Sequence, residues 1–559
     1  MYRLTALLCL VLTSFSTIAQ DKPPMAAIAS AHPLATQAGM EILGQGGNAF
    51  DAAVAVTAAL AVVQPTGSGL GGGGFWLIHE AKKNRQSMID GREMAPGAAH
   101  RDMYLDNNGK VIPGLSMDGP LAAGIPGTPA AMEKLAQQYG QLPLSQSLAP
   151  AIRYAEQGFE VNKPYQRMAT FRLKALQASP SAAATFLENN QVPRDGFIIK
   201  QPDLAQTLKA IAQHGADGFY KGEVANRLIK GVQAAGGIWT HKDLQNYTLL
   251  EREPIRSQYH DITLTSAAPP SSGGIVLSSI LNILEGYNLS DMTVAQRNHL
   301  IVEAMRRAYR DRAQYLGDSD FVDVPSEMLT NKLYAAGLRA TIHPEKATPS
   351  ALLPGAANKP KGVDTTHFSI LDKQGNRVSA TMSINYPFGS GFVAPGTGVL
   401  LNDEMDDFSS KPGTPNAYGL VGAEANAIEA GKRPLSSMTP SFLQTEDRIA
   451  ILGTPGGSRI ITMLLLAILE FAEDKPVGDW VAHPRFHHQY LPDHIQYEPG
   501  AFDSSSINQL EALGHTLKAL GSPYGGMQAI LWDKRTNEVS AASDPRGIGA
   551  AVVINPASN

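Results

Sequence analysis

Thr365 is the residue of this chain whose setting best suits a nucleophile, because it lies in the polar stretch DTTHFS at 364–369. An internal threonine hydroxyl reacts poorly. If the chain were cut after Asp364, the freed α-amine of Thr365 would have a pKa near ~8 and could act as general base for its own hydroxyl. The stretch therefore suggests a hidden amino terminus that performs acyl transfer.

A β-hairpin predicted over 366–385, THFSILD-KQG-NRVSATMSIN, would position this threonine. Gly375 supplies the left-handed residue that a three-residue hairpin loop needs. The register then sets Thr365 opposite Ser383, with Asn385 one pair further on. The Ser383 hydroxyl could orient the attack of Thr365 on the preceding carbonyl, and hydrolysis of the resulting ester would free the amine.

Strand alternation gives this hairpin one polar and one apolar face. Thr365 and Thr381 belong to the polar face, together with His367, Ser369, Ser379, Ser383 and Asn385. Polar residues on a strand face usually point to solvent. The hairpin alone therefore favours an ordinary exposed surface over a catalytic one.

A second candidate feature is the glycine corner between a strand, RIAILG at 448–453, and a helix that begins near residue 458. Backbone amides at the start of a helix stabilise negative charge that develops in a transition state. Gly456 and Gly457 could therefore form an oxyanion hole. A plain strand-to-helix connection is an equally good interpretation of these residues.

The totals indicate an exported globular protein. The chain of 559 residues is longer than one hydrophobic core of usual size can serve. A net charge of −5 gives no reason to expect nucleic-acid binding. Residues 1–19 have the basic start, short apolar run and small-residue end of a signal peptide. Cys9 is the only cysteine, so the mature chain has no disulfides, which favours a bacterial periplasmic or secreted protein. The longest later apolar run, 460–469, is too short to span a membrane.

Several elements follow from local patterns. A helix is expected over 32–43, a buried alanine-rich helix after its cap Asn48, and mostly helix over 130–240. The glycines at 67–72 match a dinucleotide-binding pattern, but a helix precedes them and a strand follows, which excludes that fold. The helix 299–315 carries an arginine cluster, expected to be solvated or ion-paired at the surface, at 306, 307, 310 and 312.

Two further segments could have a functional role. Residues 343–363 are rich in Pro, Ala, Lys and Gly without periodicity, so an exposed, mobile segment is expected just before Thr365. The histidines of HPRFHHQ, at 483, 487 and 488, could be metal ligands, but the spacing is weak for zinc, so packing and hydrogen bonding are favoured.

From about residue 28 to the DPRG at 544–547, the chain resembles the γ-glutamyltranspeptidases (glutathione hydrolases), which are N-terminal-nucleophile hydrolases. Several long motifs occur in the family's order, which makes a chance match very improbable. The motifs are SGLGGGGF at 68–75, DGREMAPGAA at 90–99, PPSSGG at 269–274, DTTHFSILDKQGN at 364–376, LLNDEMDDFS at 400–409, KRPLSSMTPS at 432–441 and GTPGGSRI at 453–460.

The resemblance implies an α+β fold, the four-layer αββα sandwich, with neither metal nor cofactor. It implies autocatalytic cleavage between Asp364 and Thr365 into a large subunit, 20–364, and a small subunit, 365–559, that stay associated. It further implies a γ-glutamyl ester on Thr365, formed from glutathione or another γ-glutamyl amide and passed to water or to an amino acid or dipeptide acceptor.

The resemblance also implies the site residues. Arg92 and the pair Ser436 and Ser437 match groups that hold the donor's α-carboxylate, and a guanidinium fork suits that role. Gly456 and Gly457 match the oxyanion hole. The family usually has threonine at Ser383, so a hydroxyl is kept there and a methyl lost. The other matches are Thr381 beside the nucleophile, Asn385, Glu404 and Asp407 around the α-ammonium, and Tyr418 as a lid residue.

Two alternatives remain at this stage. A cephalosporin or glutaryl acylase of the same superfamily accepts an acyl group without the α-amine, and the joint presence of Asn385, Glu404 and Asp407 argues against it. A non-catalytic γ-glutamyl-binding protein would remain one uncut chain, which the Thr365 pattern and the glycine corner disfavour.

Overall fold

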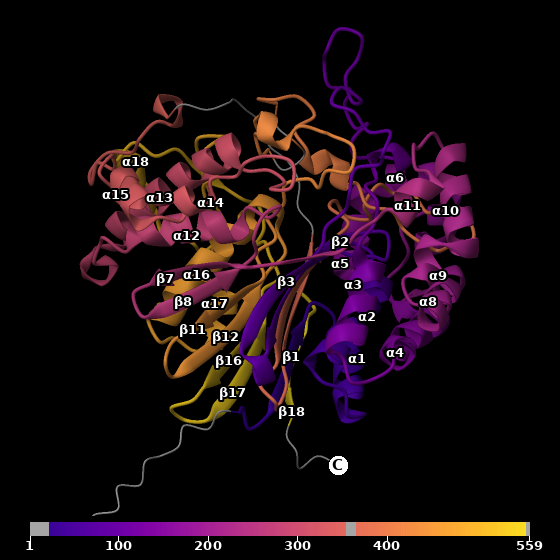
Figure 1. Ribbon diagram of the computed structural model, residues 1–559. Coiled ribbons are helices and arrows are strands. Elements are labelled where there is room, and N and C mark those ends of the chain that lie inside the picture. The colour runs from indigo at the N-terminus through magenta and orange to yellow at the C-terminus, as the bar shows by residue number, and fades with distance from the viewer. Residues whose placement is uncertain (1–21, 354–364, 415, 417–418, 555–559) are drawn as a thin grey trace, which may run out of the picture.

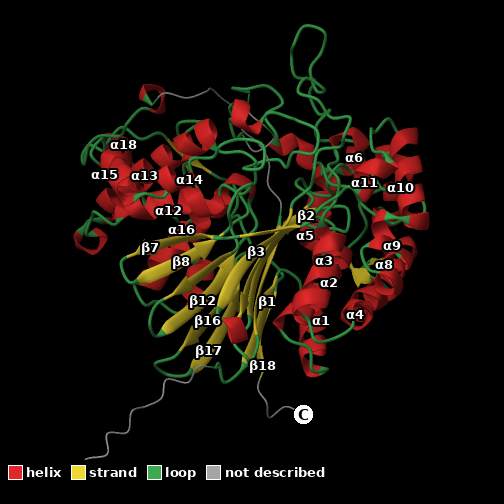
Figure 2. Ribbon diagram, in the orientation of Figure 1, coloured by secondary structure: helices red, strands yellow, loops and turns green. Residues whose placement is uncertain are grey.

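Two stacked β-sheets form the centre of the molecule, and helices cover the outer face of each (Figures 1 and 2). The computed structural model describes residues 22–353, 365–414, 416 and 419–554. This arrangement is the four-layer αββα sandwich that the sequence led us to expect. The expected signal peptide lies outside the described residues.

The first sheet is antiparallel throughout and combines strands from both sides of residue 365, with β1 (Ala26–Ser30) between two downstream strands. Its order is β18 (Ala550–Ile554), β1 (Ala26–Ser30), β9 (Thr366–Leu371), β10 (Arg377–Ser383), β2 (Gly73–Glu80), β3 (Arg85–Gly91) and β6 (Leu250–Arg252).

The second sheet packs on the first and combines downstream strands with one upstream hairpin. Its order is β17 (Glu538–Ser543), β16 (Gln528–Asp533), β12 (Arg448–Gly453), β11 (Ser441–Gln444), β8 (Ile262–Ser266) and β7 (Ile255–Tyr259). Short strands outside the two sheets pair as β4 (Phe159–Glu160) with β5 (Ile198–Ile199), and as β13 (Phe486–His487), β14 (Ile495–Tyr497) and β15 (Leu517–Ala519).

Helices of the upstream half cover the first sheet, on the right in Figure 1. They are α1 (Pro33–Gly44), α2 (Ala49–Val63), α3 (Thr128–Lys134), α4 (Leu144–Gln157), α5 (Lys163–Phe171), α6 (Leu173–Ala178), α7 (Pro180–Phe186), α8 (Pro202–His214), α9 (Asp217–Tyr220), α10 (Gly222–Ala234) and α11 (His241–Gln245). Asn48 caps α2 through a capping box with Asp51, as predicted, and every residue of α2 is buried.

The helices over the second sheet come from both halves of the chain. They are α12 (Gly273–Leu284), α13 (Val294–Tyr315), α14 (Ser326–Leu329), α15 (Lys332–Arg339), α16 (Ile460–Ala472), α17 (Val477–Ala482) and α18 (Ser504–Ala512). No helix among the described residues has the length and apolarity needed to cross a bilayer.

The hairpin β9–β10 has the predicted register. His367 pairs with Thr381, and Gly375 has φ +90° in the loop. Its polar face is not solvent-facing, however, because it packs between the two sheets. The Ser379 hydroxyl donates 3.0 Å to the carbonyl of Leu452 in the second sheet, and all of β9 and β10 is buried. The polarity of this face therefore serves contacts between the sheets.

The arginine cluster of α13 is largely buried, contrary to the expected surface position, and Arg306, Arg307 and Arg310 are ion-paired. Arg306 and Arg307 both contact the carboxylate of Glu303, and Arg306 also pairs with Asp493. Arg312 is 4 % exposed. The helix is covered on several sides, so buried partners satisfy its charges in place of water.

The described part of the loose segment, 343–353, is not exposed throughout. Ala347 and Ser350 are buried, since the Ser350 amide donates 2.7 Å to Asp493 and its hydroxyl accepts from Arg306 at 2.5 Å. Residues 354–363 lie outside the part of the chain that the structure describes.

Candidate active site

Thr365 immediately precedes β9 and lies at the wall of a cavity where the two sheets meet. It is 5 % exposed. Thr366 pairs with Met382, so the same register sets Thr365 opposite Ser383, which lines the same cavity. The Ser383 hydroxyl accepts a 2.7 Å hydrogen bond from the amide of Asn385. Ser383, the expected neighbour of Thr365, therefore lies opposite it at the cavity.

Asn385 follows β10 in a left-handed conformation, with φ +70°. Its side-chain amide donates 3.0 Å to the carbonyl of Asp403, which fixes the side chain at the cavity wall. Thr381 lies one pair deeper, where its hydroxyl is 2.8 Å from Nδ1 of His367, and it is not part of the cavity lining. Burial lowers the pKa of His367 to about 3, so this imidazole is neutral at ordinary pH.

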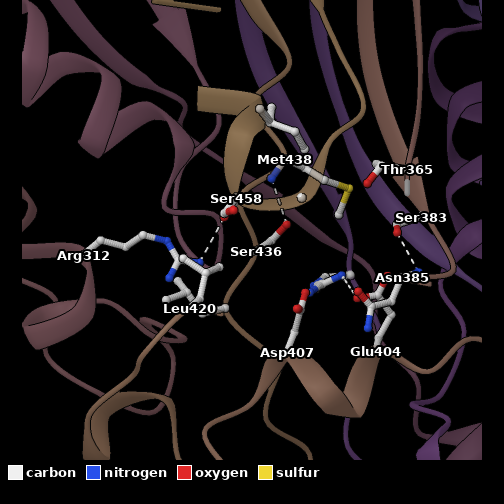
Figure 3. A pocket seen from close by; sticks show the side chains of 15 residues that line it. Arg312, Thr365, Ser383, Asn385, Glu404, Asp407, Leu420, Ser436, Met438 and Ser458 are labelled. Atoms are coloured by element: carbon white, nitrogen blue, oxygen red, sulfur yellow. Dashed lines mark hydrogen bonds and ion pairs between the residues drawn. The ribbon is translucent and has the colours of Figure 1, made fainter. Parts of the chain in front are cut away.

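A cluster of acidic groups surrounds Arg92 at the cavity, and Figure 3 shows two of them, Glu404 and Asp407, close together. Arg92 follows β3, and its two terminal nitrogens each lie 2.6 Å from a carboxylate, Glu404 Oε2 and Asp407 Oδ2. Glu93 is a third carboxylate, 3.4 Å away. The short 3₁₀ turn Glu404–Asp407 directs both of its acidic ends at the guanidinium. Arg92 is therefore already paired with acids, which the sequence did not indicate.

Burial and like charges set the protonation of this cluster. Burial, opposed by Arg92 and reinforced by Asp407, raises the pKa of Glu404 to about 7. Burial would lower the pKa of Arg92, but the neighbouring carboxylates of Glu404, Glu93 and Asp407 raise it overall. Oε1 of Glu404 is buried, and no described residue donates a hydrogen bond to it. The Ser383 hydroxyl acts to lower the pKa of the Glu404 carboxyl. An unsatisfied buried oxygen at a cavity favours a ligand that donates a hydrogen bond.

Ser436, Ser437 and Arg312 also line the cavity, and Figure 3 shows Arg312 on the side of Ser436 away from Thr365. The Ser436 hydroxyl accepts from the Met438 amide at 3.0 Å, and the Ser437 hydroxyl accepts from Arg312 Nη2 at 3.0 Å. Neither hydroxyl donates to a described residue at hydrogen-bond distance, so each proton is available to an acceptor in the cavity.

Arg312 is the functional residue that sequence reasoning missed. It also donates 2.9 Å to the Ser272 hydroxyl, and it has no carboxylate within 4 Å in the described chain. Burial lowers its pKa to about 10, partly opposed by Tyr309 and Asp407, so it stays charged at neutral pH. Its sequence signal was hidden, because it is one of four clustered arginines that were expected at the surface of this helix.

The glycine corner reaches the same cavity as Thr365, where β12 ends and α16 begins. Gly457 lines the cavity and opens a 3₁₀ turn, Gly457–Arg459, that continues into α16. Gly456 has φ +145° and Gly457 has φ +55°, conformations that favour glycine. A Cβ on Gly456 would lie 2.5 Å from Met463 Cε. This backbone geometry distinguishes the corner from a routine connection.

Two predicted site residues, Asp364 and Tyr418, lie outside the described residues. Leu420, two positions after Tyr418, lines the cavity, and its amide donates 3.1 Å to the Asn416 side chain. The segment in which a lid was expected therefore reaches the cavity at Leu420.

The histidines of 483–488 take part in packing and hydrogen bonding. His487 contacts the hydroxyl of Thr462 at 2.9 Å and the amide oxygen of Gln489 at 2.8 Å, while His488 lies 3.2 Å from Asp493. Across the residues described, no three His, Cys, Asp or Glu side chains are grouped as metal ligands.

Comparison with known proteins gives a consistent result along the chain. The family model described as "Gamma-glutamyltranspeptidase" matches residues 35–554. A "Glutathione hydrolase proenzyme" of Pseudomonas sp. (strain A14) is 43% identical, over 97% of this chain and 96% of that protein.

Two solved structures are also similar. A cephalosporin acylase from Bacillus halodurans superposes with a TM-score of 0.83 at 28% identity, covering 95% of this chain and 96% of that one. A γ-glutamyltranspeptidase chain from Helicobacter pylori gives a TM-score of 0.57 at 42% identity, covering 58% of this chain and 94% of that one.

Proposed function

The chain belongs to the γ-glutamyltranspeptidase family, an enzyme family of the N-terminal-nucleophile hydrolases; from this premise we propose that it hydrolyses and transfers γ-glutamyl groups through Thr365. Cleavage after Asp364 would activate the enzyme by freeing the Thr365 amine. The proposed donor is glutathione or another γ-glutamyl amide, and the acceptor is water, an amino acid or a dipeptide.

The observation that carries this proposal is the separation of charge across the cavity. A γ-glutamyl group carries an ammonium and a carboxylate on one carbon. Glu404 Oε1 and the Asp407 carboxylate suit the ammonium, and the hydroxyl protons of Ser436 and Ser437 suit the carboxylate. Arg312 adds positive charge behind Ser437. The charge of Arg92, by contrast, is already offset by three acids.

The proposed maturation uses the hairpin. Thr365 Oγ attacks the Asp364 carbonyl, the C–N bond breaks, and an ester forms as the hydroxyl proton passes to the amine. Water then hydrolyses this ester. We assign Ser383 to orienting Thr365 Oγ, and Thr381 to supporting the strand from one pair deeper, where it contacts His367.

The proposed turnover is an acyl transfer on the freed Thr365. Its amine takes the hydroxyl proton as Oγ bonds to the carbonyl carbon of the donor's γ-glutamyl amide, and that proton passes to the leaving nitrogen as the C–N bond breaks. Water or an acceptor amine then attacks the ester, and Thr365 recovers its proton. Amides of the Gly456–Gly457 corner are assigned to the oxyanion, and Asn385 to the ammonium side of the donor.

The remaining assignments rest on the family and on the sequence. We propose that the products of cleavage, residues 20–364 and 365–559, stay together as large and small subunits. The lid role of Tyr418 and export to the periplasm or medium through residues 1–19 remain predictions. The relatives are named proenzymes, which supports cleavage.

A cephalosporin or glutaryl acylase is the second candidate, supported by the superposition on the Bacillus halodurans acylase. The 43% identity with a glutathione hydrolase, against 28% with that acylase, favours γ-glutamyl chemistry. The acidic cluster favours it too, since a glutaryl group has no ammonium to place beside Glu404 and Asp407.

The intact mass of the purified protein under denaturing conditions tests cleavage, with Thr365→Ala as the control. We expect two masses, one of which begins at Thr365, and a single uncut mass for the variant. Initial rates on γ-glutamyl and glutaryl p-nitroanilides then distinguish the candidates. One uncut, inactive wild-type chain would instead support the γ-glutamyl-binding protein, and a cut chain active on glutaryl alone the acylase.

A further inference from the structure

A second cavity opens close to the segments that hold Thr365. Its volume is about 560 Å³, within the range of small-molecule sites. Arg167 and Phe171 of α5 form one wall, and Arg459, Tyr524 and Arg546 form another.

This cavity adjoins the active site along two short stretches of backbone. Asn385 lines the active site and Pro387, two residues later, lines the second cavity. Gly457 and Arg459 have the same relation at the glycine corner. Two residues span at most about 7 Å of backbone, so the leaving group of a ligand bound at Thr365 would have only a short distance to reach the second cavity.

The charge of the second cavity is positive. Arg546 is neutralised by Glu498 and Asp544. Arg459 donates only to the neutral amide oxygen of Gln496, at 2.6 Å from Nη2. Its guanidinium carbon lies 4.6 Å from the centre of the Tyr524 ring.

Neither Arg459 nor Arg167 has a carboxylate within 4 Å among the residues that the structure describes. Burial also lowers the pKa of Arg459, as expected for a partly enclosed cation without an anionic partner. An arginine in this state binds a carboxylate strongly, because the guanidinium fork matches it and little water need be displaced.

The remaining lining is apolar. Phe171 is 60 % exposed at the rim, and Met168, Leu520 and Pro523 continue this surface. An exposed aromatic next to unpaired cations suits a short peptide with a modest side chain and a terminal carboxylate.

We infer that this cavity binds the carboxylate-bearing peptide portion of the γ-glutamyl donor, and the peptide acceptor that replaces it, through Arg459 and Arg167. The inference rests on the proposed function, because it places the leaving group of the same reaction. It distinguishes peptide amides, which would occupy the cavity, from simple aryl amides, which would not.

The test compares three donors on the mature enzyme: glutathione, glutathione with its terminal carboxylate converted to a carboxamide, and γ-glutamyl p-nitroanilide. Arg459→Gln and Arg167→Gln remove the two cations, and Arg194→Gln serves as the control, since its side chain is 79 % exposed and lies outside the cavity lining. Release of glutamate is measured for each pair, with kcat and KM separated.

We expect the wild-type enzyme to prefer glutathione to its amide by about tenfold in kcat/KM, the effect of one charge-assisted hydrogen bond. Each cavity variant should lose about that factor on glutathione, mainly through KM, and change little on the amide and the anilide. Arg194→Gln should behave as wild type. If Arg459→Gln fails to fold, Arg167→Gln decides, because its exposed side chain has no ion pair among the described residues.

Equal rates on the acid and the amide, unchanged in both variants, would overturn the inference and leave the proposed function intact. Hydrolysis of none of the three donors by a cleaved wild-type enzyme would instead refute the proposed function. Equal losses on all three donors in the variants would assign the arginines to the corner's structure and also reject the peptide site.

Discussion

Replacing Arg312 with glutamine tests the charge that sequence reasoning missed. Arg312 Nη2 lies 3.0 Å from the Ser437 hydroxyl, and its charge has no carboxylate partner in the described chain. A hydrogen bond to a charged group contributes about 1.5–3 kcal/mol. If the Ser437 proton donates to the donor's α-carboxylate, the variant should bind γ-glutamyl donors about 10- to 150-fold more weakly.

The expected kinetic signature is a raised KM with kcat nearly unchanged, because the α-carboxylate is bound alike in the ground and transition states. The assay is hydrolysis of L-γ-glutamyl p-nitroanilide beside 4-aminobutanoyl p-nitroanilide, which keeps the ammonium and lacks the α-carboxylate. Arg312→Gln should weaken only the first substrate. Arg312→Lys should recover part of the loss, since it restores the charge without the planar fork.

Equal losses on both substrates would refute this reasoning, and so would an unchanged KM for the γ-glutamyl substrate. Arg312 is buried, so folding must be checked separately. Intact masses of the two fragments and the thermal unfolding midpoint, with and without the charge-retaining lysine, separate a binding defect from a folding defect.

Two further predictions concern the acidic cluster around Arg92 and the glycine corner. Burial raises the pKa of Glu404 to about 7, so the carboxyl ionises as pH rises from 6 to 8 and the KM for the donor should fall over that range. Glu404→Gln should remove this pH dependence, and a KM profile identical in both proteins would contradict the ammonium role. Gly456→Ala should lower kcat at least tenfold, because the new Cβ would lie 2.5 Å from Met463 and alanine avoids the φ of this residue. Gly478→Ala is the control and should keep full activity, because the space around Gly478 is open. Equal activities of the two variants would count against the oxyanion assignment.

The hairpin was predictable from sequence because local rules determine it. Gly375 set the loop, and the alternation of Phe368, Ile370 and Val378 set the buried face, so the register followed. The burial of the polar face was not predictable, because it depends on contacts with a second sheet whose strands β11 and β12 begin at Ser441 and Arg448.

The charges of the site were harder to predict for the same physical reason. Arg92 pairs with acids more than 300 positions later in the chain, Glu404 and Asp407. The arginines of α13 looked exposed because helical periodicity reports only how residues share faces, and not which faces another part of the chain covers. Family motifs pointed to side chains at the cavity, but only the structure showed that Arg92 is paired with acids and that Arg312 has no carboxylate partner among the described residues.

The interleaving of the first sheet has a consequence for reversibility. The downstream hairpin β9–β10 lies between two upstream strands, because β9 pairs with β1 and β10 pairs with β2. While the backbone is whole, folding is a first-order event. After cleavage at the proposed bond, the same native contacts would have to form between two molecules, and refolding would become second order and dependent on concentration. The mature enzyme would then persist through slow unfolding, because dissociation would expose strand edges in both fragments.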